Sequence, residues 1–172
     1  MRNTGRLWRN ATPPDRNAPM HRLELRIPPL ALAAAFAGAI ALASAHAPLL
    51  RLPFPGRRLV AASLAIAGLA VALAGVVQFR RARTTVDPTS PERTTAIVTS
   101  GLYRWSRNPM YLGMALMLLG AAAWASTLAG YLLVAAFCAY LTRFQIVPEE
   151  RALAVAFGHE FERYAATVRR WI

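Results

Sequence analysis

The sequence has no lysine and a single cysteine, and both scarcities exclude classes of site. All 20 basic residues are arginines, set against eight acidic residues, for a net charge of +12. The lone Cys138 lies in an apolar stretch, so neither a disulfide within the chain nor a cysteine-rich metal site is possible. The three histidines, His21, His46 and His159, share no ligand spacing. We therefore predict no bound metal.

Several long stretches of the chain carry no charged residue, and 56% of all residues are hydrophobic. These uncharged stretches are long enough to cross a bilayer as helices. The sequence predicts an all-α membrane protein with about four transmembrane helices and a C-terminal interfacial amphipathic helix. The predicted spans are residues 30–50, 59–79, 109–125 and 128–147. The arginines flank these spans, which favours contact with anionic membrane lipids and gives no support for nucleic acid as a partner.

The N-terminal region, residues 1–27, is polar and arginine-rich with little periodicity. We expect a disordered basic tail there, followed by a membrane domain over residues 28–172. Small residues at 43–47 resemble a signal-peptide cleavage site, which leaves a cleaved precursor with a mature N-terminus near Pro48 as an alternative. The long leader and the later spans favour a retained first helix.

The arginines are distributed unevenly along the chain. Six precede the first span, three follow it, six lie between the second and third spans, none at the hairpin tip and five from Arg143 onward. By the positive-inside rule, both termini and the loop at residues 80–108 face the cytoplasm of a multi-pass protein, most simply in a bacterial inner membrane. The same rule puts Glu149 and Glu150 on the side of that loop.

A polar, aromatic passage precedes the third span. Asn108 and Pro109 are a typical helix start, with Asn as N-cap and Pro in the first turn. Because the third and fourth spans form a hairpin, Tyr103, Asn108 and Tyr111 are expected to line one wall of a pocket whose other wall carries Glu149. The alternative is that the aromatic residues are only interfacial anchors. The residues alone name no reaction.

The last segment, residues 149–168, has apolar side chains at helical spacing and charges between them. We predict one amphipathic helix lying along the membrane surface. Arg169, Arg170 and Trp171 are then expected to anchor its end in the interface.

Two motifs resemble a known family. The first is TTAIVTSGLYRWSRNPMYLG at residues 94–113, and the second is PEE at 148–150 followed by FGHEFERY at 157–164. Together they resemble the isoprenylcysteine carboxyl methyltransferase family, which is related to the phospholipid methyltransferases. The resemblance covers residues 94–172 and implies a membrane methyltransferase that uses S-adenosylmethionine.

The resemblance also implies which residues contact the cofactor, and it assigns no catalytic residue. These contacts are Thr95, Ala96, Ile97, Val98, Tyr103, Asn108, Pro109, Met110, Tyr111 and Glu149. The family more often has His in place of Asn108, and an asparagine cannot take up a proton at neutral pH. Asn108 is therefore expected to be a contact and not a base.

The acceptor is less defined. Eukaryotic prenylcysteine enzymes have an arginine where this chain has Gln145, while Arg143 lies half a turn away. Arg143 and Gln145 are the candidate acceptor-binding residues, and carboxyl methylation of a prenylcysteine is in doubt. We predict a small or lipid-like acceptor bearing a carboxylate, thiol or amine. The alternatives are a phospholipid N-methyltransferase, a thiol S-methyltransferase, or a catalytically silent membrane scaffold.

Overall fold

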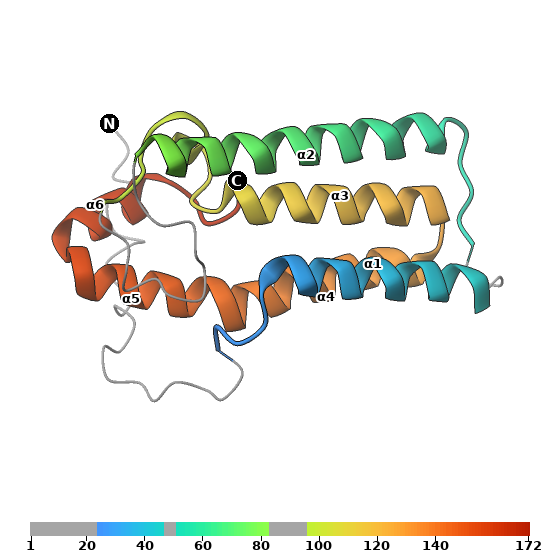
Figure 1. The fold of residues 1–172 in the computed structure, drawn as a ribbon. Coiled ribbons are helices and arrows are strands. Elements are labelled where there is room, and N and C mark those ends of the chain that lie inside the picture. The colour runs from blue at the N-terminus through green and yellow to red at the C-terminus, as the bar shows by residue number, and fades with distance from the viewer. Residues whose placement is uncertain (1–23, 47–50, 83–95) are drawn as a thin grey trace, which may run out of the picture.

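The computed structural model describes residues 24–46, 51–82 and 96–172. Four long helices lie side by side in these residues (Figure 1). They are α1 (Pro29–His46), α2 (Arg57–Arg81), α3 (Pro109–Ala125) and α4 (Leu128–Leu141). The prediction of an all-helical membrane protein is confirmed. Residues 1–23 of the predicted tail and Thr95 lie outside the described residues.

The fourth helix is longer than its span. It continues from α4 through the π-helical turn η4 (Thr142–Ile146) into α5 (Val147–Phe157). α1, α2 and this continuous helix of 30 residues are long and apolar enough to cross a membrane, whereas α3 is a shorter apolar helix. Thirty helical residues extend about 45 Å, against about 30 Å of hydrocarbon. α5 therefore projects from the bundle, past the start of α1 (Figure 1).

Pro148 does not interrupt this helix, although the predicted fourth span ends at residue 147 and the predicted amphipathic helix begins at residue 149. A proline in a helix leaves the carbonyl four residues earlier without its donor and clashes with it. Here the preceding turn is widened to a π-helical one, and that carbonyl, from Phe144, accepts a hydrogen bond from the Leu25 backbone N–H at 3.1 Å. The segment before α1 thus replaces the missing donor.

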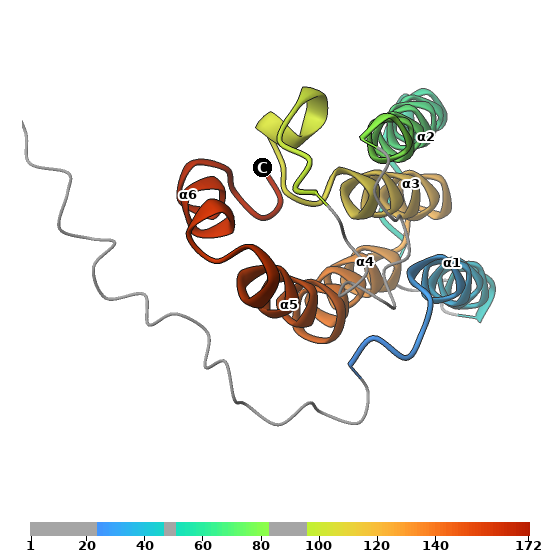
Figure 2. The same ribbon diagram turned by 60° about the vertical axis from the view of Figure 1, so that its left-hand side comes forward.

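The prediction of one interfacial helix over residues 149–168 is wrong in its bounds. The chain breaks after α5 at Gly158, whose φ of +51° favours glycine. α6 (His159–Thr167) then turns back toward the start of α3 (Figure 2). Tyr164 on α6 donates a hydrogen bond to the backbone carbonyl of Tyr103 at 2.7 Å. The apolar side chains of this segment therefore do not form one stripe along a single helix.

The α2–α3 pair is held at close range by glycines. A Cβ built on Gly113 would lie 2.5 Å from the Gly68 carbonyl oxygen, and one built on Gly75 would lie 2.8 Å from the Met110 side chain. Small residues permit such close helix contact in lipid. The core lies between α1, α3 and α4, with the buried side chains Ile40, Tyr111, Phe137 and Leu141.

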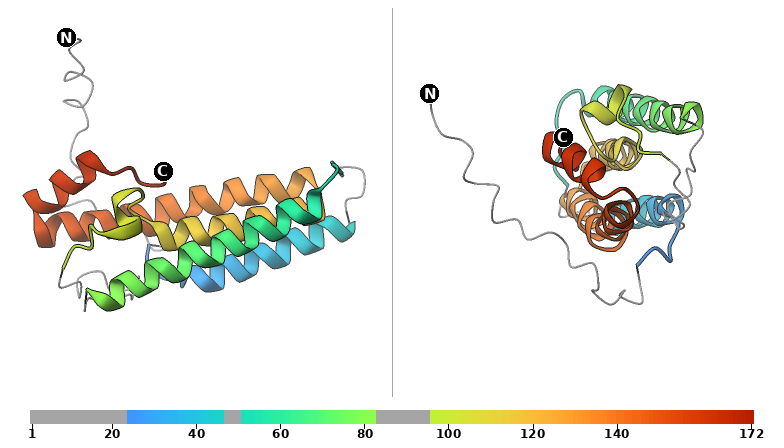
Figure 3. Two further views of the ribbon diagram at one scale, coloured as in Figure 1. Left: turned by 90° about the horizontal axis from the view of Figure 1, so that it is seen from above. Right: turned by 90° about the vertical axis from the view of Figure 1, so that its left-hand side faces the viewer.

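α5, α6 and the segment before α3 gather at one end of the bundle, as two further views show (Figure 3). A short 3-10 helix, η3 (Gly101–Arg104), precedes α3. It is tied to the last turn of α2, because the Leu102 N–H donates to Oε1 of Gln78 at 3.0 Å. This end therefore holds η3, the start of α3, α5 and α6 together.

Candidate functional site

The start of α3 meets the continuous helix through a buried pair of polar side chains. The Tyr111 hydroxyl donates to Oε1 of Glu149 at 2.5 Å, and Nε2 of Gln145 donates to the same oxygen at 2.8 Å. Tyr111 and Gln145 are each only 3% exposed. The hairpin thus brings together the two polar motifs, as the sequence predicted.

Along the continuous helix, Glu149 lies past the position that is opposite the first residue of α1. Phe144 is level with Leu25, which itself precedes the start of α1. Glu149 is five residues farther along, or about 7 Å. Burial raises the pKa of Glu149 to about 7, although the hydrogen bonds from Tyr111 and Gln145 act in the opposite direction. Its carboxyl group therefore changes charge near neutral pH.

Tyr103 is a second buried phenol near this carboxyl group. It is 3% exposed, its ring packs edge-on against Phe79 at 5.1 Å, and burial raises its pKa, with further contributions from Tyr164 and Glu149. Within the described residues its hydroxyl has no hydrogen-bond partner. An unsatisfied buried hydroxyl costs about 1–3 kcal/mol. A ligand with a polar group at this position would remove that cost.

Asn108 occupies the predicted N-cap position of α3 and Pro109 follows in the first turn, but the Asn108 side chain makes no capping hydrogen bond. Its Nδ2 donates to the backbone carbonyl of Arg170 at 3.0 Å. Its own N–H donates to Oγ of Ser106 at 3.1 Å. The C-terminal segment competes for this side chain because it passes directly beside the start of α3.

The remaining predicted contacts lie around the same helix start. Pro109 is buried in the first turn of α3, and Met110 packs against α2 at Gly75. Ala96 and Ile97 are half-buried and Val98 is buried, in the segment that leads to η3. Within the part of the chain that the structure describes, no hydrogen bond joins these residues to Glu149.

The two candidate acceptor residues separate. Gln145 faces Glu149, whereas Arg143 pairs with Glu24 at 2.7 Å. Residues two apart on a helix point to nearly opposite sides. Arg151 also pairs with Glu24, at 2.6 Å, and the Glu24 side chain is only 1% exposed. Burial tends to raise the Glu24 pKa, but hydrogen bonds and charge from the two arginines together hold it below its ordinary value.

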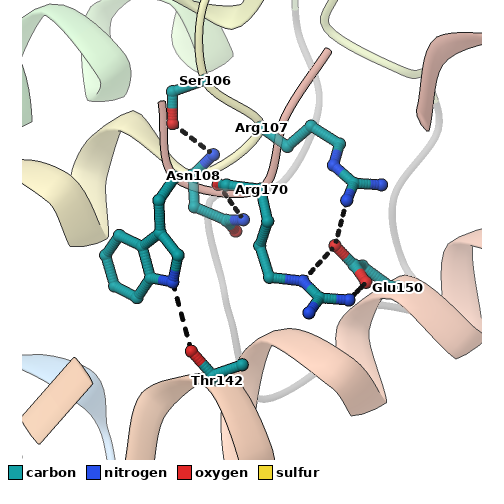
Figure 4. A network of polar contacts seen from close by, with 7 residues as sticks. Ser106, Arg107, Asn108, Thr142, Glu150 and Arg170 are labelled. Atoms are coloured by element: carbon teal, nitrogen blue, oxygen red, sulfur yellow. Dashed lines mark hydrogen bonds and ion pairs between the residues drawn. The ribbon is translucent and has the colours of Figure 1, made fainter. Parts of the chain in front are cut away.

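The sequence reasoning missed the C-terminal segment Val168–Ile172, which we call the C-terminal strap. Nη2 and Nε of Arg170 donate to the two oxygens of Glu150 at 2.6 and 3.1 Å, and Arg107 pairs with Glu150 at 3.2 Å (Figure 4). Nε1 of Trp171 donates to Oγ1 of Thr142 at 3.2 Å. Arg170 and Trp171 thus bind the protein itself, which corrects their prediction as membrane anchors.

No sequence signal identifies these strap contacts. Arg170 is 20 residues from Glu150 and 62 from Asn108, and none of these spacings belongs to a helical or turn pattern. The sharp turn at Gly158 creates the contacts, and a glycine alone does not specify the direction that the chain takes after it.

Comparison with known proteins places the chain in a family. The profile of the phospholipid methyltransferases matches residues 57–160, which is more than half of the chain. An uncharacterized protein of Haemophilus influenzae is 40% identical over 63 residues, which are 37% of this chain and all of that protein. No solved structure matches the chain. The chain belongs to the phospholipid methyltransferase family, a family of membrane methyltransferases.

Proposed function

We propose that the protein transfers a methyl group from S-adenosylmethionine to a lipid-like acceptor at the cytoplasmic membrane interface. The observation that carries this proposal is the buried carboxyl group of Glu149, which is held by Tyr111 and Gln145 near the unpartnered hydroxyl of Tyr103. All four residues lie within the stretch that matches the family. We call them the donor cluster.

The donor cluster fits the chemistry of this cofactor. S-adenosylmethionine carries an ammonium group and a sulfonium group, and the Glu149 carboxylate is an acceptor for a charged donor. The Tyr103 hydroxyl offers both a donor and an acceptor to a second polar group. When bound, the cofactor supplies an electrophilic methyl group. The chain supplies orientation and exclusion of water, since Tyr103, Tyr111 and Gln145 are almost fully buried.

Asn108 contributes an acceptor in this proposal. A carbonyl oxygen only accepts hydrogen bonds, so the Asn108 atom that faces the Arg170 carbonyl is the amide nitrogen. Oδ1 of Asn108 is then directed away from that carbonyl, and in this proposal it accepts a hydrogen bond from the cofactor. The segment 95–98, Pro109 and Met110 complete the proposed contacts as the resemblance implies. No residue is assigned as a base.

A lipid amine is the acceptor that the family favours. The outward faces of α1 and α2 expose large apolar side chains such as Leu30 (70%) and Ile66 (70%), as contact with lipid requires. A lipophilic acceptor would then approach sideways from the bilayer. A prenylcysteine carboxylate is disfavoured, because Arg143 binds Glu24 and Gln145 binds Glu149. The arginine distribution supports cytoplasmic termini in a bacterial inner membrane.

An acceptor screen with methyl-labelled cofactor on membranes that contain the protein tests this proposal. We expect label in the extractable lipids, with most of it lost in Glu149→Ala and retained in Glu162→Ala, a control on the exposed side of α6. Far greater labelling of water-soluble acceptors would contradict a lipid-like acceptor. Absence of transfer to every acceptor class would favour the scaffold alternative.

A further inference from the structure

The C-terminal strap joins both walls of the donor cluster. On the α3 side, the backbone carbonyls of Arg169 and Arg170 accept hydrogen bonds from the Arg107 N–H and the Asn108 amide, both at 3.0 Å. On the other side, the Arg170 side chain holds Glu150 and the Trp171 indole holds Thr142 (Figure 4). The same gap is bridged by the hydrogen bond between Tyr111 and Glu149. The strap therefore crosses the gap in which the donor cluster lies.

The ionic half of this attachment is accessible to water. The side chains of Arg170 and Glu150 are 36% and 14% exposed, and Arg107 is 14% exposed. Ion pairs in contact with solvent are weak, and salt screens them. The strap also follows the break at Gly158 and reaches α3 through α6 alone, without passing through the bundle. Besides its polar contacts, it touches the bundle core through the partly buried side chain of Trp171.

We propose that the C-terminal strap covers the donor cluster and can detach from it. Arg170 is the positioning residue that holds the strap in the closed position through its ion pair with Glu150, which we call the latch. This inference rests on the proposed function. In the closed state Arg170 fixes Glu150 through its side chain and orients the Asn108 amide through its carbonyl. Release of the ion pair leaves the strap attached to the continuous helix through Trp171, and this weaker attachment lets the strap detach and open the gap to the methyl donor and its product.

Arg170→Gln tests the latch in the full-length protein, with S-adenosylhomocysteine as the probe. The association and dissociation rate constants of the probe are measured in detergent for wild type and variant. If the strap must detach before the probe can enter or leave, it limits both the association and the dissociation rate constant. We expect both rate constants to rise about two- to fivefold, as the loss of one exposed ion pair implies, with little change in Kd.

Matched variants distinguish a specific effect of the Arg170–Glu150 ion pair from a general loss of folding or binding. Arg169→Gln changes the neighbouring, exposed arginine, which contributes only its carbonyl, and we expect wild-type rates. Arg170→Lys keeps a charge and should restore most of the latch, while Glu150→Gln should reproduce Arg170→Gln. Raising NaCl should speed exchange in the wild type and leave Arg170→Gln unchanged.

Two results would overturn the inference while leaving the proposed function intact. Wild-type rates in both Arg170→Gln and Glu150→Gln would show that the strap does not limit exchange. A rise in the dissociation rate constant alone, with an equal loss of affinity, would make the strap a fixed wall of the site. A wild-type protein that binds no probe would overturn the proposed function and the inference together.

Discussion

At the scale of single residues, Glu149 is where the two motifs meet. One of its oxygens accepts hydrogen bonds from both Tyr111 and Gln145, and its burial is what raises its pKa to about 7. Two donors on one oxygen hold the carboxyl group in a single orientation. A buried carboxyl group with a raised pKa is typical of a functional site.

The raised pKa predicts that binding of the donor depends on pH. Below about 7 the folded protein holds Glu149 protonated, and a neutral carboxyl group is a poorer acceptor for an ammonium donor. Affinity for S-adenosylhomocysteine should therefore fall about tenfold from pH 8 to pH 6. Titration calorimetry at both pH values measures this change. Glu149→Gln should bind more weakly and with little pH dependence; an equal pH dependence in this variant would assign the effect to another group.

Sequence reasoning predicted part of this cluster. The contact between Tyr111 and Glu149 follows from a hairpin of known length, because antiparallel helices place their first and last turns together. The N-cap position of Asn108 was predicted correctly, but the bond from its side chain to the Arg170 carbonyl and the contact of Arg170 with Glu150 were missed. The contacts of Asn108 and Arg170 both depend on the path of the strap, and the spacing of residues in the sequence does not predict that path.

At the scale of elements, α3 is the central helix. It is an apolar helix of 17 residues, shorter than the three helices that are long enough to cross a membrane, and it packs against α2 through glycines and against α1 and α4 through the core. Its first turn carries Tyr111. The position of the donor cluster therefore depends on how closely α3 approaches α2.

Gly113→Ala tests this packing. A Cβ at this position would lie 2.5 Å from the backbone oxygen of Gly68, which cannot move away without shifting α2. We expect a loss of about 1–3 kcal/mol in unfolding free energy, typical of overpacking. Thermal unfolding in detergent measures it, with Gly38→Ala on α1 as the control, since nothing lies within 4 Å of a Cβ there. Equal stability of the two variants would contradict the close contact.

The helix bounds show what local sequence leaves open. The helices at α1 to α4 follow from apolar length alone, and their existence was predicted. The fourth span was predicted to end at residue 147, but the helix continues through Pro148. The Leu25 N–H, far away in the sequence, donates to the Phe144 carbonyl that the proline leaves without a donor. Gly158 was read as part of a continuous helix and instead breaks it. A tertiary hydrogen bond accounts for the first case, and the positive φ of Gly158 accounts for the second.

At the scale of the whole molecule, the bundle has one apolar body and one polar end. The Tyr111–Glu149 contact, the Glu24 ion pairs and the strap all lie at the end where α1 begins, α2 ends and α3 begins. The family match covers residues 57–160 and stops before the strap. The strap itself therefore lies outside the matched stretch, whereas its partners Asn108, Thr142 and Glu150 lie inside it.

The central claim is that this polar end binds the methyl donor through Glu149, and titration calorimetry with S-adenosylhomocysteine on the purified full-length protein tests it most directly. We predict saturable binding with a stoichiometry of about one per chain. Glu149→Ala should weaken it by about 10- to 100-fold, as expected for the loss of a charge-assisted hydrogen bond. Glu162→Ala should bind like the wild type. Absence of binding, or equal binding by wild type and Glu149→Ala, would contradict the account.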